Sequence, residues 1–252
     1  MRLEITTYVG CPMDCTDCPQ ALLRGKYKGR KTMRLEDYKA AIDKVPTECR
    51  IDFSGMCEPF CNEACTDMIL YAWEKGHPIA LYTTLQGSTV EDWERLKDVQ
   101  YEVCTIHLPD KNDRSHFRIN SEYLEVLGLW DCNNYSCHGQ LDERVRPYLK
   151  PRNLITFMHD RAGNVECRPH KTIEANRPLY CVTSGKQMNH NVLLPDGTVL
   201  MCCMDYGMTG VFGNLFEQSY DEVINSPTAQ AMRKTLEEGE SICRHCANAI
   251  CQ

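Results

Sequence analysis

The sequence lacks the features that would place it in a membrane or on nucleic acid. No run approaches the roughly 20 apolar residues that a membrane span needs, and residues 1–7 alternate charged and apolar side chains instead of forming a signal-peptide core. Basic charge is in deficit, with 28 Lys and Arg against 35 Asp and Glu and a net charge of −7. Such an acidic chain is a poor candidate for sequence-independent nucleic-acid binding. We therefore expect a cytoplasmic protein with neither membrane nor nucleic acid as a partner.

Cysteine is what the sequence has in excess. The 252 residues include 17 cysteines, and 42% of the residues are hydrophobic, which is enough for a proper core. Cysteines at this density in a small secreted chain would suggest disulfides, but the length, the odd count and the missing signal peptide argue against that class. Clustered cysteines in a cytosolic chain more often bind metal. The sequence therefore predicts metal sites.

The first two-thirds of the chain alternates strand-like and helix-like segments. The expected strands are residues 2–9, 50–54, 78–84, 101–108 and 153–158, and the expected helices are 35–45, 62–75, 89–97 and 121–129. Asn62 is a candidate cap for the second helix and Ser88–Glu91 a capping box for the third. Regular alternation of this kind predicts βα units and a parallel sheet. Five strands are too few for a closed eight-stranded barrel, so we predict an α/β fold with a partial, open TIM-like barrel.

The pattern changes near Asn164. Residues 163–179 have the composition of a linker, and residues 191–194 and 198–202 flank a Pro-Asp-Gly turn that predicts a β-hairpin. Two short helices follow, at 219–225 and 228–237. We therefore divide the chain into a partial barrel over residues 1–165 and a small α+β domain over 166–252. A metal cluster could stabilise this second unit, which is too small to bury much surface alone.

Two cysteine groups carry the chemistry. The first, Cys11-x3-Cys15-x2-Cys18, follows the first strand, where barrels of this kind place their active sites. Three thiolates can hold three irons of a 4Fe–4S cube and leave the fourth iron open to a small molecule. Taken alone, the pattern also fits a zinc site that borrows a distant fourth ligand.

The second group can ligate a cluster completely, because it has four thiols. Its spacing is Cys181-x15-Gly197-x4-Cys202 followed by Cys243-x2-Cys246. Zinc also accepts four thiolates, so the spacing alone leaves both metals open, and Cys203 is an alternative ligand. Ten cysteines remain unassigned, and most are expected to be small buried hydrophobes: Cys49, Cys57, Cys61, Cys65, Cys104, Cys132, Cys137, Cys167, Cys203 and Cys251.

The segment Asp52-Phe-Ser-Gly55-Met-Cys-Glu58-Pro59 directly follows the second strand. With the first cysteine group, it resembles the radical S-adenosylmethionine (SAM) superfamily, which has C-x3-C-x2-C after strand one and a Gly-Gly-Glu-Pro-like turn after strand two. In this sequence Asp17 stands where the family usually has an aromatic residue, and Cys57 replaces the second glycine of the turn. The resemblance implies an exchangeable SAM on the open iron, with Glu58 pairing with the SAM ammonium. The cofactor-binding residues it implies are Gly55, Met56, Cys57, Glu58, Pro59, Thr83, Thr84 and His107. A solvated loop charge is the alternative for Glu58, and a hydrogen bond at the rim is the alternative for His107.

The C-terminal cysteine spacing and the segment 213–219 are similar to the SPASM subgroup of that superfamily. The cysteine count matches its shortened twitch form, with one auxiliary 4Fe–4S cluster. The resemblance therefore implies two sets of metal ligands: Cys11, Cys15 and Cys18 for the first cluster, and Cys181, Cys202, Cys243 and Cys246 for the auxiliary cluster.

The resemblance implies reductive cleavage of SAM to a 5′-deoxyadenosyl radical, with electrons from a donor such as flavodoxin or ferredoxin. In layout the chain is similar to the short aminocyclitol dehydrogenases of the subgroup. It begins almost at the first strand, which leaves no leader-binding extension and favours a small hydroxylated substrate of the sugar, sugar-nucleotide or aminocyclitol type. We expect a two-electron oxidation of that substrate through the auxiliary cluster. The alternatives are a radical epimerase with a cysteine hydrogen donor, a peptide- or protein-modifying enzyme similar to sulfatase maturases, and a non-catalytic iron–sulfur or zinc protein.

Basic residues are concentrated in two places despite the acidic balance. They form either a clamp for a phosphorylated or nucleotide-linked substrate or an ordinary solvated surface. The candidates are Arg24, Lys26, Lys28, Arg30 and Lys31 after the first cysteine group, and Arg114 and Arg118 after the fourth strand.

Overall fold

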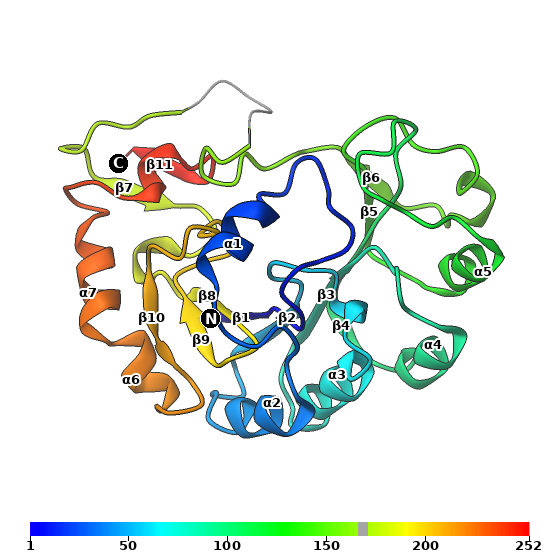
Figure 1. Cartoon of the computed structure of the whole chain (residues 1–252), viewed down its shortest axis with the longest axis horizontal. Coiled ribbons are helices and arrows are strands. Elements are labelled where there is room, and N and C mark those ends of the chain that lie inside the picture. Colours follow the sequence, from blue (N-terminus) through cyan, green and yellow to red (C-terminus); the bar gives the residue numbers. More distant parts are fainter. Residues whose placement is uncertain (166–170, 252) are drawn as a thin grey trace.

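One nine-stranded sheet, open at both edges, organises the molecule (Figure 1). The computed structural model describes residues 1–165 and 171–251, and within them the strand order is β10-β9-β8-β1-β2-β3-β4-β5-β6. Neighbouring strands from β8 through β1 to β6 are parallel. The prediction of an open, partial barrel is therefore confirmed. The parallel strands are β1 (Arg2–Ile5), β2 (Arg50–Phe53), β3 (Ile79–Thr83), β4 (Tyr101–His107), β5 (Asn134–Ser136), β6 (Asn153–Ile155) and β8 (His190–Leu193).

The helices of the barrel lie on the convex side of the sheet, except for one. Figure 1 shows α2 to α5 following one another along that side, while α1 lies on the opposite, concave side. Each of α2, α3 and α5 packs an apolar face against the sheet, as the sequence pattern predicts. The bounds are α1 (Gln20–Lys26), α2 (Leu35–Ile42), α3 (Cys65–Glu74), α4 (Val90–Leu96) and α5 (Ser121–Leu129).

The C-terminal third joins the same sheet. The predicted hairpin forms from β8 and β9 (Thr198–Leu200), and β10 (Val211–Asn214) extends it antiparallel. Gly197 closes the turn at φ +90°, where a Cβ atom would lie 2.3 Å from Asn214 Oδ1, so only glycine fits. Because β8 pairs in parallel with β1, the last strands continue the barrel wall.

The remaining elements enclose the C-terminal cysteines. Strands β7 (Leu179–Cys181) and β11 (Ala249–Cys251) form a separate antiparallel pair that brings the end of the chain back to Cys181. Helices α6 (Tyr220–Ile224) and α7 (Pro227–Lys234) lie beside β10 (Figure 1). None of the helices in residues 1–165 and 171–251 is long and apolar enough to cross a membrane.

Local details differ from the sequence prediction at the helix starts. The capping box is Thr89 with Asp92, one residue later than predicted, because Thr89 and Asp92 exchange reciprocal side-chain and backbone hydrogen bonds. Asn62 does not cap α3, which begins later, at Cys65. Its amide instead donates to Thr7 O (3.1 Å) and Met33 O (2.9 Å). These two bonds join the loop after β1 to the segment that precedes α2.

Two elements of the barrel, α1 and β5, were not predicted, and neither were the C-terminal strands β7, β10 and β11. In α1 only Gln20 and Leu23 are buried, and the helix contains a glycine, so its sequence shows little of the apolar periodicity of a helix. The strand β5 is three residues long, which is shorter than a recognisable alternating pattern. The predicted linker begins within described residues, but residues 166–170, and with them Cys167, lie outside the described residues.

Candidate functional site

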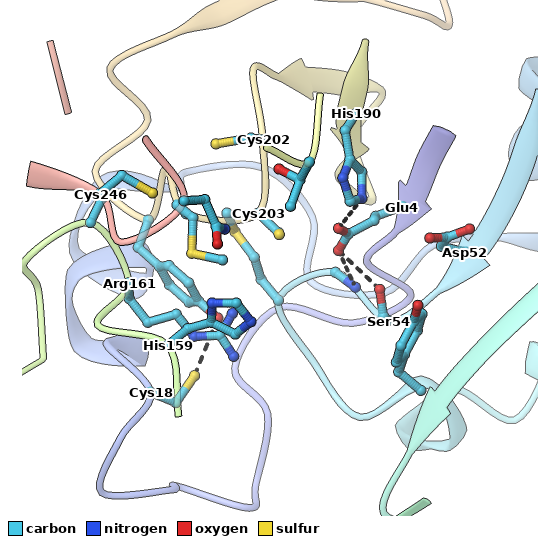
Figure 2. Close-up of a pocket in the computed structure, with 18 of the residues that line it drawn as sticks. Glu4, Cys18, Asp52, Ser54, His159, Arg161, His190, Cys202, Cys203 and Cys246 are labelled. Carbon is cyan, nitrogen blue, oxygen red and sulfur yellow. Dashed lines mark hydrogen bonds and ion pairs between the residues drawn. The ribbon is translucent and has the colours of Figure 1, made fainter. Parts of the chain in front are cut away.

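One cavity of about 440 Å³ opens at the C-terminal ends of the parallel strands. Parallel strands end at one edge of the sheet, so the loops after β1, β2, β3 and β5 and the end of β4 all reach it. All seven predicted metal ligands line this cavity, although they come from opposite ends of the chain: Cys11, Cys15, Cys18, Cys181, Cys202, Cys243 and Cys246. The fold therefore brings both cysteine groups to one space (Figure 2).

The three N-terminal thiols have different hydrogen-bond partners. Cys11 Sγ accepts from the backbone N–H of Glu58 at 3.4 Å, while Cys18 Sγ lies 3.3 Å from the Tyr206 hydroxyl. Burial raises the pKa of Cys15 to about 12 and also raises that of Cys18. A bound metal would counteract this shift, because it holds its cysteine ligands as thiolates.

The chemistry of the cavity fits an iron–sulfur cluster with a bound ligand. Asp17 Oδ1 and Gln20 Oε1 are buried polar atoms that line the cavity and have no hydrogen-bond partner among the described residues. Such atoms need a partner from outside the chain, either water or a ligand. In the part of the chain that the structure describes, no three His, Cys, Asp or Glu residues converge on one ion.

The loop after β2 is fixed tightly against β1. Gly55 has φ +63°, and a Cβ atom there would lie 2.4 Å from Thr6 Oγ1, so this position requires glycine. Met56 N donates to Thr6 Oγ1 at 3.1 Å, and Pro59 O accepts from Thr7 Oγ1 at 2.8 Å. Of the turn residues predicted to bind the cofactor, Gly55 to Glu58 line the cavity, while Pro59 begins a 3-10 turn behind it.

Glu58 is buried and not a solvated loop charge, with 4% of its surface exposed. Its carboxylate accepts from Thr83 Oγ1 (2.6 Å), Thr84 Oγ1 (2.7 Å), Thr84 N (2.5 Å) and Phe60 N (3.2 Å). Burial raises its pKa overall. These bonds occupy about all four acceptor positions of a carboxylate and join the loop after β2 to the end of β3. Pairing of Glu58 with a SAM ammonium stays a prediction. It requires Glu58 to accept a hydrogen bond from the ammonium in place of one of these four.

His107 belongs to a polar group at the ends of β4 and β5. Its Nδ1 lies 3.0 Å from Ser136 Oγ, and its ring centroid is 4.5 Å from that of His138, which pairs with Asp17. Burial, helped by His138, lowers the pKa of His107 to about 4, so the ring is neutral near pH 7. For Asp17, burial alone would raise the pKa, but the hydrogen bond with His138 lowers it overall. Sequence reasoning found His107 but missed Ser136 and His138, since β5 itself was not predicted.

A second polar group lines the barrel interior, and sequence reasoning missed it. Glu4 Oε1 lies 2.6 Å from His190 Nε2, and its other oxygen accepts from Ser54 Oγ at 2.9 Å and Gly55 N at 3.0 Å (Figure 2). Burial would raise the pKa of Glu4, but the contacts with His190 lower it to about 2. Nearby, Asp52 pairs with Arg50 through two hydrogen bonds. In the sequence, the available signal was Glu4, which lies between two apolar residues of the predicted first strand. A charged residue that is buried in this way needs a partner.

Arg161 projects into the cavity, which Arg2 also lines. Its guanidinium carbon lies 5.9 Å from the centroid of the Tyr206 ring, and within the described residues it forms no hydrogen bond or ion pair. Arg161 and Ala162 both have positive φ, at 50° and 56°. Asp160 holds this turn by accepting from Ala162 N at 3.2 Å and from Ala247 N at 3.3 Å. Non-glycine residues in that conformation are strained, and such strain is common at functional sites.

Arg244 anchors the C-terminal Cys-x2-Cys turn and was also missed. It is fully buried and donates to the carbonyl oxygens of Gly239 (2.9 Å), Glu174 (3.0 Å) and Thr235 (2.8 Å), and to that of Arg177. Because Arg244 lies between Cys243 and Cys246, these bonds fix the turn that presents both thiols. Among the unassigned cysteines of the described chain, Cys57 and Cys203 line the cavity.

None of the seven predicted anion-binding residues is part of the described cavity lining. Arg30 pairs with Asp37 and lies over the Phe216 ring, and Arg24 lies 3.7 Å from Asp14. Arg114 donates to His138 O at 3.3 Å. The other four have exposed side chains: Lys26, Lys28, Lys31 and Arg118. Their use as a phosphate clamp stays a prediction without support from the cavity.

Comparison with known proteins agrees with this arrangement. Residues 181–247 match the family model of the SPASM iron–sulfur cluster-binding domain. No curated protein sequence matches the chain.

Solved structures share the fold over nearly the whole chain. BtrN in complex with AdoMet and 2-DOIA is 19% identical with a TM-score of 0.68, covering 98% of this chain and 92% of that one. SuiB from Streptococcus suis, bound to its precursor peptide SuiA, is 13% identical with a TM-score of 0.60, covering 97% and 69%. The enzyme anSMEcpe with bound AdoMet is 12% identical with a TM-score of 0.59, covering 98% and 86%. The predicted resemblance to the SPASM/twitch subgroup is thus confirmed.

Proposed function

With a SPASM iron–sulfur domain on the fold of the radical SAM enzymes, this chain is, we propose, an oxidoreductase that uses SAM to remove hydrogen from a small hydroxylated substrate held in its cavity. The observation that carries the proposal is that both cysteine groups line one cavity. When bound, the two clusters and SAM would supply a radical that abstracts hydrogen and a second redox centre that accepts an electron. The chain itself must bind, orient and shield the substrate.

The cavity suits a small polar molecule. The clusters and SAM would share its volume of about 440 Å³, which favours a small substrate. Donors and acceptors line it on several sides, from Arg161 and Glu4 to His107 and Ser136. A hydroxylated ring offers both kinds of hydrogen-bonding group to such a lining. The complex of BtrN with AdoMet and 2-DOIA supports a ligand of small size.

Oxidation of an alcohol to a carbonyl removes one hydrogen atom, one proton and one electron. His107 is placed to take the proton, since it lines the cavity and burial keeps it neutral. Arg161 is placed to bind the substrate oxygen, because its guanidinium has no hydrogen-bonding partner in the described chain. Both assignments are part of the proposal.

Anaerobic reconstitution tests the proposal. We expect about eight irons per chain, and formation of 5′-deoxyadenosine from SAM in the presence of dithionite. Cys18→Ala should abolish it, whereas Cys137→Ala, a buried cysteine outside the cavity lining, should not. Incubation with a panel of sugars, aminocyclitols and nucleotide sugars should reveal one that loses two mass units. Absence of 5′-deoxyadenosine from the iron-loaded wild type would refute the enzyme assignment.

A second candidate function is radical epimerisation, and Cys203 favours it. This thiol lines the cavity beside Glu4 and Arg161 and is not one of the seven predicted ligands. A thiol in that place can return a hydrogen atom to a substrate radical, and the thiyl radical left on its sulfur would take up one proton and one electron from the reduced auxiliary cluster. Reaction in D₂O separates the two functions, since an epimerised product keeps its mass in H₂O and gains one deuterium in D₂O. If the enzyme is an epimerase, Cys203→Ala should stop the reaction. If it is a dehydrogenase, the same substitution should leave the reaction intact.

Peptide modification is the third candidate, supported by the structure of SuiB with its precursor peptide. A short precursor peptide encoded beside the gene would provide the substrate to test. Conversion of that peptide, with no turnover of the small molecules, would replace the small-substrate proposal.

A further inference from the structure

Tyr206 connects the C-terminal cysteine loop to the N-terminal cysteine group. Its hydroxyl oxygen lies 3.3 Å from Cys18 Sγ, across a long separation in sequence. Only 1% of Tyr206 is exposed, and the ring packs in a buried cluster with Met56 and Val192. The contact therefore has a fixed position within the core.

The loop that carries Tyr206 also carries Cys202. Asp205 closes this loop by accepting from Thr209 N (2.8 Å), Thr209 Oγ1 (2.9 Å) and Gly210 N (2.7 Å). Its own N–H donates to Cys202 O at 3.1 Å. The position of the Tyr206 hydroxyl is thus tied to the position of an auxiliary-cluster ligand.

The direction of the hydrogen bond follows from metal binding. A cysteine that ligates iron is a thiolate without a proton, so the Tyr206 hydroxyl is the donor and Cys18 the acceptor. Gln20 Nε2 donates to the same sulfur from 3.7 Å. Hydrogen bonds to cluster sulfurs set the reduction potential, and donors favour the reduced state because it carries one more negative charge.

We propose that Tyr206 is a positioning residue that raises the reduction potential of the N-terminal cluster, and that it makes this potential depend on the loop that carries Cys202. The inference rests on one part of the proposed function, the cluster at Cys11, Cys15 and Cys18. It is independent of the substrate and of the fate of its radical.

The test compares Tyr206→Phe with Tyr220→Phe in the reconstituted, full-length chain. Tyr220 is a matched control, since it is 3% exposed and its hydroxyl lies 3.8 Å from Cys49 Sγ, outside the cavity lining. An EPR-monitored redox titration gives the potentials, and the signal that SAM perturbs identifies the N-terminal cluster. We expect a more negative potential in Tyr206→Phe and no change in Tyr220→Phe. An unchanged potential in an iron-complete Tyr206→Phe protein would overturn the inference.

Replacement of Tyr206 by 3-fluorotyrosine provides a second measurement with almost the same side-chain shape. The fluorinated phenol is a stronger hydrogen-bond donor, so the potential should move in the opposite direction, to a more positive value. A zero or negative shift contradicts the inference, even if Tyr206→Phe fails to fold. If the wild type assembles no cluster at Cys18, the proposed function fails as well. If it does, and neither replacement shifts the potential, the inference alone fails.

Discussion

Glu4 of β1 and His190 of β8 form a buried pair, with 2.6 Å between Oε1 and Nε2, at the seam where the C-terminal strands join the barrel. The two strands run in parallel there, and Arg2 is the register partner of His190. This pair connects the first strand of the chain to the hairpin that leads to Cys202. Loss of this pair should therefore disturb the positions of both cysteine groups.

Glu4→Gln should destabilise the fold by about 3 kcal/mol, because an amide NH₂ replaces one of two buried carboxylate oxygens, which contact His190, Ser54 and Gly55. Urea unfolding measures this, with Glu102→Gln as control, since that carboxylate is 55% exposed and 3.6 Å from Arg50. The control should change stability by less than about 1 kcal/mol. Equal effects from both substitutions would contradict the role of the seam pair.

The same pair predicts a pH dependence. The pKa of Glu4 is lowered from 4.5 to about 2 in the folded chain, so its stabilising contribution is complete above pH 4.5 and is lost as the pH falls toward 2. Unfolding free energy measured across that window should decline less steeply in Glu4→Gln than in the wild type. Parallel curves for the two proteins would show that Glu4 does not titrate in this way.

Arg244→Met should cost about 3 kcal/mol or more, because it removes a buried side chain that donates to four backbone carbonyls. The Cys243–Cys246 turn would lose its anchor, and iron content should fall from about eight to about four per chain. Arg233→Met is the matched control, since Arg233 also donates to two carbonyls but near the surface. Retention of all irons in Arg244→Met would refute the anchoring role.

Gly55→Ala should abolish SAM binding, because the new Cβ would lie 2.4 Å from Thr6 Oγ1 and displace the loop after β2. Gly76→Ala is the control: Gly76 also has positive φ, at 90°, but open space surrounds it. Both substitutions carry about 1 kcal/mol of backbone strain, so a difference between them isolates the clash. Equilibrium binding of SAM to the reconstituted proteins measures it.

His107→Gln should slow substrate oxidation by about 10²–10⁴-fold if the imidazole accepts the substrate proton. Because the pKa of His107 is lowered to about 4, a rate that needs the neutral ring should persist to about that pH and fall below it. Rate–pH profiles of wild type and variant at saturating SAM test this. An acid limb near pH 6.5 in the wild type would point to a different base.

The parts of the fold that could be predicted from sequence are those with local signals. The helix at Ser121–Leu129 matches its predicted bounds, and the Pro-Asp-Gly turn forms the predicted hairpin. The strand β5 escaped because three residues are too short for a period, yet it contributes Ser136 to the cavity. A local pattern has no means of indicating such a strand.

The cysteine groups could be predicted as groups, but not their meeting in one cavity. Arg161 and His190 had no local signal at all, since their roles depend on strands and turns distant in sequence. The basic residues near Lys28 drew attention by charge density alone, and the fold turns most of them toward solvent. Spacing predicts which residues can act together within one loop, while tertiary pairing decides what surrounds them.

The pairing of β1 with both β2 and β8 has a consequence for biogenesis. During synthesis the first strand emerges early, but one of its two neighbours, β8, begins only at His190. Until the ribosome has made that segment, one edge of β1 has no hydrogen-bonded neighbour. Glu4 also lacks its partner His190. The contact of Tyr206 with Cys18 likewise forms only after the chain beyond β8 has been made.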